Sequence, residues 1–244
     1  MFIEINELSK TFKDKIAVNH LDLKINEGEL FSLLGVNGAG KTTTIRMLCG
    51  LSKPSEGNAF IFGKSIVKDL DEVKAMINLS PQETAIAKNL SVRENLMLMA
   101  EIYGFDKVKA KTKVDDVVRQ FSLEEVLNSK AKTLSGGWQR RLSIAMALIT
   151  EPKVLFLDEP TLGLDVLARR ELWRIIQKLK GDITIILTTH YMEEAEALSD
   201  RIAIMVKGNM KALGTLEELR QGTGLNSLED IFVKIVEESE EYEN

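Results

Sequence analysis

The feature that most constrains the fold is a glycine-rich loop between two apolar patterns. Residues 35–43 read Gly-Val-Asn-Gly-Ala-Gly-Lys-Thr-Thr and satisfy the spacing G-x-x-x-x-G-K-[ST]. Before the loop, Leu30–Leu34 is a short apolar run that suits a strand buried on both faces, and a helical apolar pattern follows towards Cys49. A strand, a glycine-rich turn and a helix in this order predict a phosphate-binding loop in an α/β fold.

The chemistry of this loop follows from its backbone. Successive N–H groups wrap a phosphate, the following helix directs its positive end at it, and the glycines allow unusual φ angles and close approach. We expect Lys41 to bridge the β- and γ-phosphates and Thr42 to offer its hydroxyl to Mg²⁺. A surface turn with a lysine is the competing interpretation, which the full pattern disfavours. The loop residues expected to contact the nucleotide are Gly35, Val36, Asn37, Gly38, Ala39, Gly40, Lys41, Thr42 and Thr43.

Two acids follow another apolar run later in the chain. Val154–Leu157 predicts a buried strand, and Asp158 and Glu159 come directly after it. Ligands of parallel sheets bind at the carboxyl ends of the strands. Asp158 is suited to hold Mg²⁺, directly or through water, and Glu159 is suited to activate the attacking water. Alone, the acids fit the start of a polar loop equally well, but the phosphate loop favours a functional pair.

A third segment carries a pattern for binding an anion. A hydroxyl and two glycines, Ser135, Gly136 and Gly137, precede an apolar helix predicted over Leu142–Ile149. A helix N-terminus of this kind favours an anion. By itself the segment fits a serine cap and a flexible turn. Its position between the phosphate loop and the acidic pair favours a role in nucleotide binding.

The remaining pattern indicates an α/β chain with a helical insertion. Residues 84–150 show helices and no convincing strand, with capping-box patterns at Ser91–Glu94 and Ser122–Glu125. A third capping box starts at Thr215, and the acidic run Glu237–Glu241 is expected to be solvated or frayed. Further strands are predicted over Phe2–Leu8, Leu21–Ile25, Ile183–Leu187 and Ile202–Val206.

Composition excludes several classes of protein. The chain has 244 residues, 44% hydrophobic residues and a formal net charge of −5, which fits a globular protein and argues against a globally basic nucleic-acid binder. The single cysteine, Cys49, rules out a disulfide-stapled secreted domain. The N-terminus lacks the basic start and apolar run of a signal peptide, and no stretch reaches the roughly eighteen apolar residues of a membrane span. We therefore expect a soluble chain whose membrane connection comes through a partner.

Together these segments resemble the ATP-binding subunits of ABC transporters over nearly the whole chain. Gly35–Thr43 is similar to the family's Walker A motif. Leu134–Gly137 resembles its signature motif, which is highly specific. Val154–Glu159 resembles Walker B with its catalytic glutamate. Several ordered motifs of this kind do not coincide by chance.

Four further positions extend the resemblance. Gln82 is similar to the Q-loop glutamine, which implies a Mg²⁺ ligand and γ-phosphate sensor, and His190 to the switch histidine, which implies hydrogen bonds to the γ-phosphate and the attacking water. Phe12 falls where the family stacks an aromatic ring, commonly tyrosine, on adenine, and Gly163–Asp165 resembles the D-loop. Trp138 departs from the pattern, because the fifth signature position is usually glutamine.

The resemblance also implies an architecture and a set of partners. The expected fold is a P-loop NTPase core with a mainly parallel sheet, an N-terminal antiparallel β region and an inserted α-helical lobe. One ABC ATP-binding domain would comprise an ATPase core (1–83 and 151–221), a helical subdomain (84–150) and a C-terminal extension (222–244). The implied cofactors are ATP and Mg²⁺. The implied partners are a transmembrane permease subunit and a second copy of the chain, with no nucleic acid, and the implied location is the cytoplasmic face of the cell membrane.

Within the family the chain looks most like the exporter-associated group that includes antibiotic- and sodium-efflux ATPases. The grounds are the residues after the D-loop, Ala168–Trp173, and the late segment Ser227–Phe232. Two alternatives stay open: a soluble ABC-type ATPase that moves no solute, and a P-loop kinase that phosphorylates a small molecule. The first is disfavoured because the chain has no room for a coiled-coil insertion, and the second because it leaves Ser135–Gly137 without a role.

Overall fold

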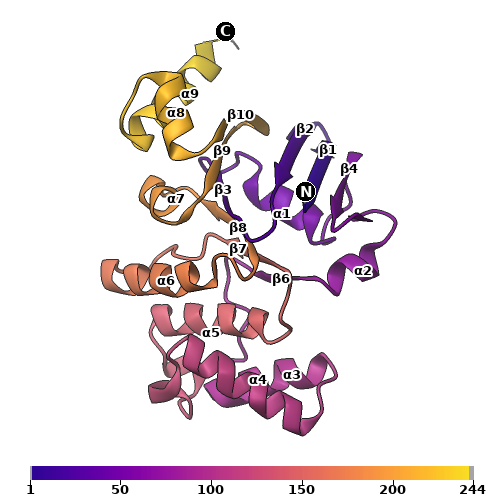
Figure 1. Cartoon of the computed structure of the whole chain (residues 1–244), viewed down its shortest axis with the longest axis vertical. Helices are drawn as coiled ribbons and strands as arrows, with labels where there is room; N and C mark the ends of the chain where they lie inside the picture. Colours follow the sequence, from indigo (N-terminus) through magenta and orange to yellow (C-terminus); the bar gives the residue numbers. More distant parts are fainter. Residues whose placement is uncertain (1, 242–244) are drawn as a thin grey trace.

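The structure is a computed structural model that describes residues 2–241 as two β-sheets, a helical lobe and a group of C-terminal helices (Figure 1). The smaller sheet is four-stranded and antiparallel, with the order β2-β1-β4-β5. Its strands are β1 (Ile3–Phe12), β2 (Lys15–Ile25), β4 (Glu56–Ile61) and β5 (Lys64–Ser65). This is the antiparallel region expected near the N-terminus.

The larger sheet is six-stranded, with the order β10-β9-β3-β8-β7-β6, and only β10 runs antiparallel to its neighbour. Its strands are β3 (Leu30–Leu34), β6 (Ile77–Ser80), β7 (Val154–Asp158), β8 (Thr184–Thr189), β9 (Arg201–Val206) and β10 (Asn209–Gly214). Every residue of β3, β7 and β8 is buried, which explains their uninterrupted apolar runs. Because these strands are parallel, the loops that follow them start at the same edge of the sheet.

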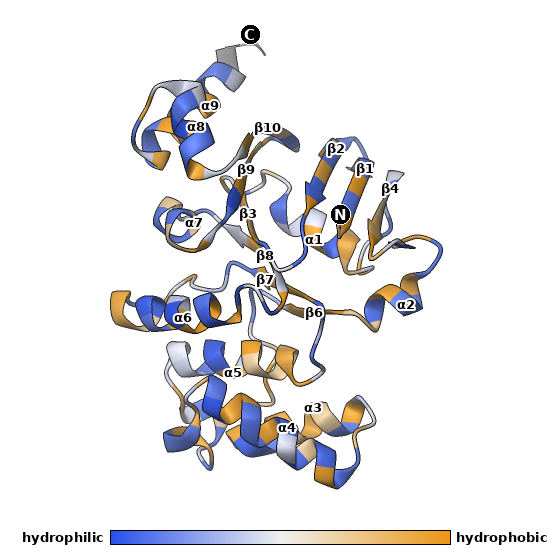
Figure 2. Cartoon of the chain, in the orientation of Figure 1, coloured by the Kyte–Doolittle hydropathy of each residue, from blue (hydrophilic) through white to orange (hydrophobic). Residues whose placement is uncertain are grey.

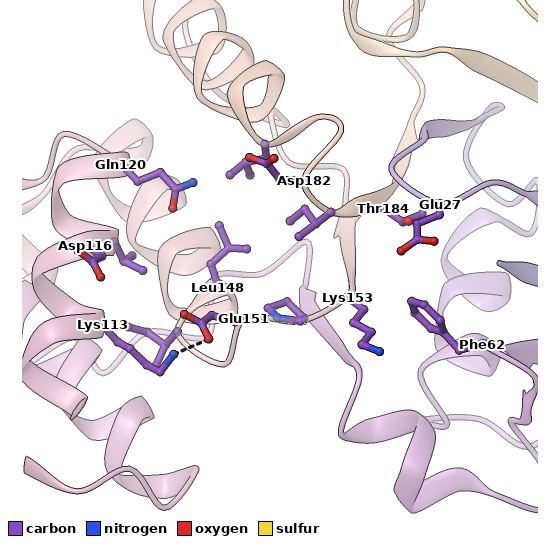
Figure 3. A pocket seen from close by; sticks show the side chains of 15 residues that line it. Glu27, Phe62, Lys113, Asp116, Gln120, Leu148, Glu151, Lys153, Asp182 and Thr184 are labelled. Carbon is purple, nitrogen blue, oxygen red and sulfur yellow. Dashed lines mark ion pairs between the residues drawn. The ribbon is translucent and has the colours of Figure 1, made fainter.

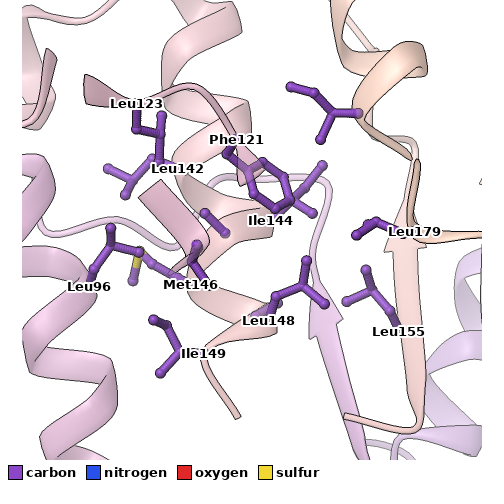
Figure 4. Close-up of a cluster of buried hydrophobic side chains, with 14 of the residues drawn as sticks. Leu96, Phe121, Leu123, Leu142, Ile144, Met146, Leu148, Ile149, Leu155 and Leu179 are labelled. Carbon is purple, nitrogen blue, oxygen red and sulfur yellow. The ribbon is translucent and has the colours of Figure 1, made fainter. Parts of the chain in front are cut away.

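The helical lobe consists of α3 (Val92–Ile102), α4 (Lys107–Gln120) and α5 (Gly136–Leu148), with short 3₁₀ turns between α4 and α5. Its apolar side chains form one cluster with residues of the larger sheet. Figure 4 shows Phe121 and Ile144 of the lobe close to Leu179 and Leu155 of the core. The lobe and the sheet therefore share a single hydrophobic cluster.

The remaining helices cover the sheets. α1 (Lys41–Leu48) buries Ile45, Met47 and Leu48 in a cluster with residues of both sheets. The other helices are α2 (Leu70–Lys74), α6 (Val166–Leu179), α7 (Met192–Leu198), α8 (Leu216–Thr223) and α9 (Leu228–Glu241). Figure 2 shows the central strands as mainly hydrophobic and α6 as a helix with hydrophilic and hydrophobic residues, as expected for a helix with one buried face.

The predicted fold class is confirmed, with corrections in detail. The capping box predicted at Ser122–Glu125 is wrong, because Ser122 has a φ of +50° and only a 3₁₀ turn follows, without a side-chain cap. The helix expected from Leu142 already begins at Gly136. The acidic run Glu237–Glu241 lies in helix α9, with Glu237 and Glu238 exposed, so it is solvated but not frayed. Strands β4, β5, β6 and β10 were not predicted, since all four are short and partly polar. Residues 242–244 of the predicted C-terminal extension lie outside the described residues.

Candidate active site

The loop between β3 and α1 encloses its own lysine. The Nζ of Lys41 donates hydrogen bonds to the carbonyl oxygens of Gly35 at 2.7 Å and Val36 at 3.2 Å. Only 4% of Lys41 is exposed, and this burial lowers its pKa, while the nearby carboxylate of Glu159 acts in the opposite direction. The loop therefore holds a cation within reach of the helix N-terminus, a position that suits a phosphate group.

Glycine is required at Gly40 and favoured at Gly38, which precede α1. Gly38 and Gly40 have φ angles of +84° and +104°, which side chains rarely tolerate. A Cβ on Gly40 would also lie 2.5 Å from the carbonyl oxygen of Ala17, so the loop packs directly against β2. At Gly38 there is open space, so only its conformation favours glycine.

Asp158 ends β7 beside the hydroxyl of Thr42. Its Oδ1 accepts hydrogen bonds from Thr42 Oγ1 at 3.0 Å and from Thr188 Oγ1. Mg²⁺ prefers such oxygen ligands at about 2.0–2.1 Å in an octahedron, where neighbouring ligands are about 3 Å apart. The Thr42–Asp158 pair therefore fits one edge of a Mg²⁺ site. Residues 2–241 contain no cluster of three or more His, Cys, Asp or Glu side chains that would hold a metal ion without further ligands.

Glu159 lies between Lys41 and His190. Its Oε1 is 3.5 Å from Lys41 Nζ, and its Oε2 is 3.1 Å from His190 Nδ1. The backbone of Glu159 has a φ of +47°, and its N–H donates to the carbonyl oxygen of Thr188 at 3.0 Å and to the Thr188 hydroxyl at 3.1 Å. The backbone of β8 therefore holds this carboxylate beside the lysine of the phosphate loop, where it can accept a proton from water.

A cleft of about 420 Å³ opens at this edge of the larger sheet. Phe12, at the end of β1 and 50% exposed, stands at the cleft with Lys10 Nζ 4.9 Å from its ring centre. Gln82, which follows β6, also lines the cleft. The predicted site residues that line it are Phe12, Asn37, Gly38, Ala39, Gly40, Lys41, Thr42, Thr43, Gln82 and Glu159. Asp158 and His190 adjoin them through Thr42 and Glu159.

The glycine-rich segment at the start of α5 is not part of this cleft. Ser135 is the N-cap of α5, but its hydroxyl makes no capping hydrogen bond, whereas the hydroxyl of Ser91 in the same lobe accepts one from Glu94 N. Ser135 and Gly136 are exposed. A Cβ on Gly137 would lie 2.9 Å from the Cβ of Ala168, so glycine there allows α5 and α6 to approach. The structure thus leaves the serine hydroxyl available to a ligand.

Some residues of the site were not predicted from the sequence. Lys15 and Ala17 line the cleft, and Thr188 contacts both acids. Arg140, on α5, donates to the carbonyl oxygens of Pro81 at 2.7 Å and Gln82, and so links the helical lobe to the Gln82 loop. Only Thr188 had a sequence signal, because it belongs to the threonine-rich strand end before His190.

A second cavity of about 420 Å³ lies between the helical lobe and the core (Figure 3). Lys113 of α4 forms an ion pair with Glu151 there at 2.6 Å, and Lys153 stands over the ring of Phe62. None of the predicted site residues lines this cavity. The cleft at the phosphate loop is therefore the candidate active site.

Over residues 2–241, no helix has both the length and the apolar character needed to cross a membrane.

The chain is similar in sequence to members of one family of known proteins. The sequence profile of the family described as ABC transporter matches residues 18–162, more than half of the chain. The daunorubicin/doxorubicin resistance ATP-binding protein DrrA of Streptomyces peucetius is 39% identical over 227 residues, which cover 93% of this chain and 69% of DrrA. Human phospholipid-transporting ATPase ABCA3 is 45% identical over 226 residues, which cover 91% of this chain but only 13% of ABCA3.

A solved structure shares the fold. It is the dimeric post-hydrolysis state of an ATP-binding cassette bound to ADP and Pi, with a TM-score of 0.78 and 26% identity over 87% of this chain and 98% of that chain. The family profile, the relatives and the solved structure point to the same assignment. The chain spans about an eighth of the length of ABCA3, and it belongs to the ABC transporter family as an ATP-binding ATPase domain.

Proposed function

We propose that this subunit powers a transporter by closing as a head-to-tail homodimer around two ATP molecules. Each ATP would lie between the phosphate loop of one chain and the Ser135–Gly137 segment of the other. The observation that carries the proposal is the uncapped and exposed Ser135 at the N-terminus of α5, which lies outside the chain's own cleft. The dimeric state of the related cassette bound to ADP and Pi supports it.

Nucleotide binding would use the loop and its surroundings. Phe12 stacks on adenine, the loop N–H groups surround the phosphates, and Lys41 neutralises the β- and γ-phosphates. Thr42, Asp158 and Gln82 would hold Mg²⁺, since the first two already place oxygens 3.0 Å apart and Gln82 lines the same cleft. When bound, the ion neutralises charge on the transferred phosphoryl group.

Hydrolysis would depend on Glu159 and His190. A water oxygen attacks the γ-phosphorus, the bond to the oxygen that bridges the β- and γ-phosphates breaks, and Glu159 accepts the proton that the water loses. His190, 3.1 Å from Glu159, orients that carboxylate and donates to the γ-phosphate. Because ATP bridges the chains, its cleavage removes the contact and favours the open dimer.

The permease partner would dock beside the active site. A groove of about 330 Å³ between α1 and the helical lobe is lined by apolar side chains that include Leu51, Leu79 and Tyr103, of which Leu51 is 62% exposed and Tyr103 48%. It adjoins β6, the strand that leads to Gln82. An apolar helix of a transmembrane permease in this groove would connect transport to Gln82 and hold the chain at the cytoplasmic face of the membrane. The drug-resistance name of DrrA favours export.

The domain division expected from the sequence remains part of the proposal. The ATPase core would comprise 1–83 and 151–221, the helical subdomain 84–150 and the C-terminal extension 222–244. Arg140 supports a coupled rather than independent lobe, because it links α5 to the Gln82 loop.

Neutralising the proposed general base tests the dimer. Glu159→Gln should bind ATP, form a dimer in light scattering and hydrolyse ATP poorly, because the water then lacks a proton acceptor. The same variant with Ser135→Ala should stay largely monomeric. Rapid steady turnover by Glu159→Gln, or a monomer with saturating ATP, would contradict the proposal. Co-purification with a polytopic membrane protein would separate transport from a soluble ATPase role.

A further inference from the structure

A buried carboxyl group that the proposed mechanism does not use lies on α7, beyond His190. Glu194 is 0% exposed. Its Oε1 accepts hydrogen bonds from Thr161 Oγ1 at 2.8 Å and from Trp173 Nε1 at 3.1 Å. Its Oε2 has no hydrogen-bond partner among the described residues. A single oxygen atom therefore joins α7 to α6 and to the turn after β7.

The turn that Glu194 contacts is the one that carries Glu159. Thr161 is 1% exposed, and the carbonyl oxygen of Glu159 accepts from Leu162 N at 3.2 Å in the same turn. On the other side, α7 follows His190 directly, and Ala195 N donates to the carbonyl oxygen of Tyr191 at 3.3 Å. The Glu194–Thr161 bond thus links the backbone after Glu159 to the helix after His190.

Burying a carboxyl group at this position costs folding free energy unless the group accepts hydrogen bonds. Burial raises the pKa of Glu194, and the hydrogen bonds from Thr161 and Trp173 together with the Arg169 charge act against this. An apolar side chain here would leave the buried hydroxyl of Thr161 and the indole N–H of Trp173 without an acceptor. The geometry therefore indicates that the carboxyl oxygen is retained as an acceptor for these two donors.

We propose that Glu194 is a positioning residue for ATP hydrolysis. It fixes the turn after β7 against α7 and so keeps the Glu159 carboxylate within hydrogen-bonding distance of His190. It contacts neither the nucleotide nor the attacking water. This inference rests on the roles proposed above for Glu159 and His190, whose side chains lie 3.1 Å apart. A small displacement of a general base is enough to slow a reaction strongly while substrate binding stays intact.

Steady-state ATPase kinetics with two variants test the link. Glu194→Leu removes the acceptor and should lower kcat about tenfold while the KM for ATP and the Kd from calorimetry change less than about twofold. Glu194→Gln keeps a carbonyl oxygen at the Oε1 position and should retain most of the wild-type kcat. An unchanged kcat in Glu194→Leu, a rise in KM that accounts for its loss, or an equal loss in Glu194→Gln would overturn the proposal.

Thr161→Val removes the same hydrogen bond from the other side and leaves the carboxyl group in place. It should lower kcat in the same direction, and combining it with Glu194→Leu should cost little beyond Glu194→Leu alone. It also carries the test if Glu194→Leu does not fold, because an unchanged kcat in Thr161→Val would overturn the proposal. Circular dichroism at the assay temperature verifies that each variant is folded.

Glu159→Gln, measured in parallel, separates a failure of the proposed function from a failure of the proposed role of Glu194. If Glu159→Gln keeps wild-type turnover, the proposed function fails. If Glu159→Gln loses turnover while Glu194→Leu and Thr161→Val keep theirs, the role of Glu194 alone is refuted.

Discussion

The N-termini of α1 and α5 are both suited to a phosphate group, but only the first is complete within the chain. At α1, Gly40 precedes a buried lysine that the loop carbonyls hold, Glu159 lies beside this lysine, and Asp158 lies beside Thr42. At α5, Ser135 is exposed, its hydroxyl makes no capping bond, and no lysine adjoins it in the sequence. A helix N-terminus with unused donors is satisfied by water or by a ligand. Under the proposed function, the first site binds nucleotide alone and the second depends on a nucleotide held by another chain.

The largest effect is expected at the complete site. Lys41→Ala should reduce ATP affinity about a hundredfold or more and abolish ATPase activity, because the β- and γ-phosphates lose their only lysine contact in the loop. Isothermal titration calorimetry measures the affinity, and Lys211→Ala, an exposed lysine of β10, is the matched control. Unchanged ATP binding by Lys41→Ala would contradict the assignment of residues 35–43 as a phosphate-binding loop.

A pair of serine variants distinguishes a ligand site from an ordinary helix cap. Ser135→Ala should lower ATPase activity about tenfold with little change in stability, because a hydrogen bond to a charged group is lost but no capping bond exists. Ser91→Ala should leave activity unchanged and lower the unfolding free energy by about 1 kcal/mol, because its capping box is broken. ATPase assays and urea unfolding read out both variants. A loss of stability in Ser135→Ala together with a loss of activity in Ser91→Ala would contradict the assignment of Ser135 as a ligand site and Ser91 as a helix cap.

The two glycines of the segment should also differ. Gly137→Ala places a Cβ 2.9 Å from Ala168 and should lower the unfolding free energy by about 1–3 kcal/mol. At Gly136 the nearest side-chain atom is Leu164 Cδ2 at 3.7 Å, so Gly136→Ala should fold normally and weaken only ATP-dependent dimerisation. Thermal unfolding and light scattering separate the outcomes, and equal destabilisation by both substitutions would contradict this assignment.

The smallest effect concerns Cys49 at the end of α1. Burial raises the pKa of the Cys49 thiol well above its usual range, so a maleimide should not react with it in the folded chain. A cysteine introduced by Ser135→Cys should react readily, and ATP should protect it if a second chain covers it. Mass spectrometry measures both reactions. Rapid labelling of Cys49 would contradict its burial at the end of α1. A lack of ATP protection at position 135, in a variant that still binds ATP, would contradict the proposal that a second chain covers the N-terminus of α5.

The sequence predicted those parts of the fold that depend on local chemistry. Leu30–Leu34 and Val154–Asp158 are fully buried strands, and the capping boxes at Ser91 and Thr215 are both formed. The capping box at Ser122 was wrong because its neighbours Phe121 and Leu123 are both 0% exposed. Their packing sets the turn there, and a local hydroxyl bond of modest strength does not override it.

Composition and spacing predicted the site where its residues follow one another along the chain, and the family resemblance added the isolated residues Phe12, Gln82 and His190. The phosphate loop and the acids of β7 come together because parallel strands end at one edge, which the alternation of strands and helices already indicated. Lys15 and Arg140 reach the site from β2 and α5 through packing between distant segments. A lone lysine or arginine has no periodic pattern, so neither position was distinguishable from a solvated charge.

The hydrophobic cluster that runs from the helical lobe into β7 and α6 limits how this chain can be recombined with its relatives. In a chimera that exchanged only residues 84–150, the lobe would come from one parent and the core from the other. Side chains at positions such as Phe121 would then pack against the other parent's side chains at positions 155 and 179. Volume mismatches in such an interior cost stability in either direction. A graft that includes β7 and α6 would keep both sides of the boundary from one parent, and it should yield the more stable hybrid.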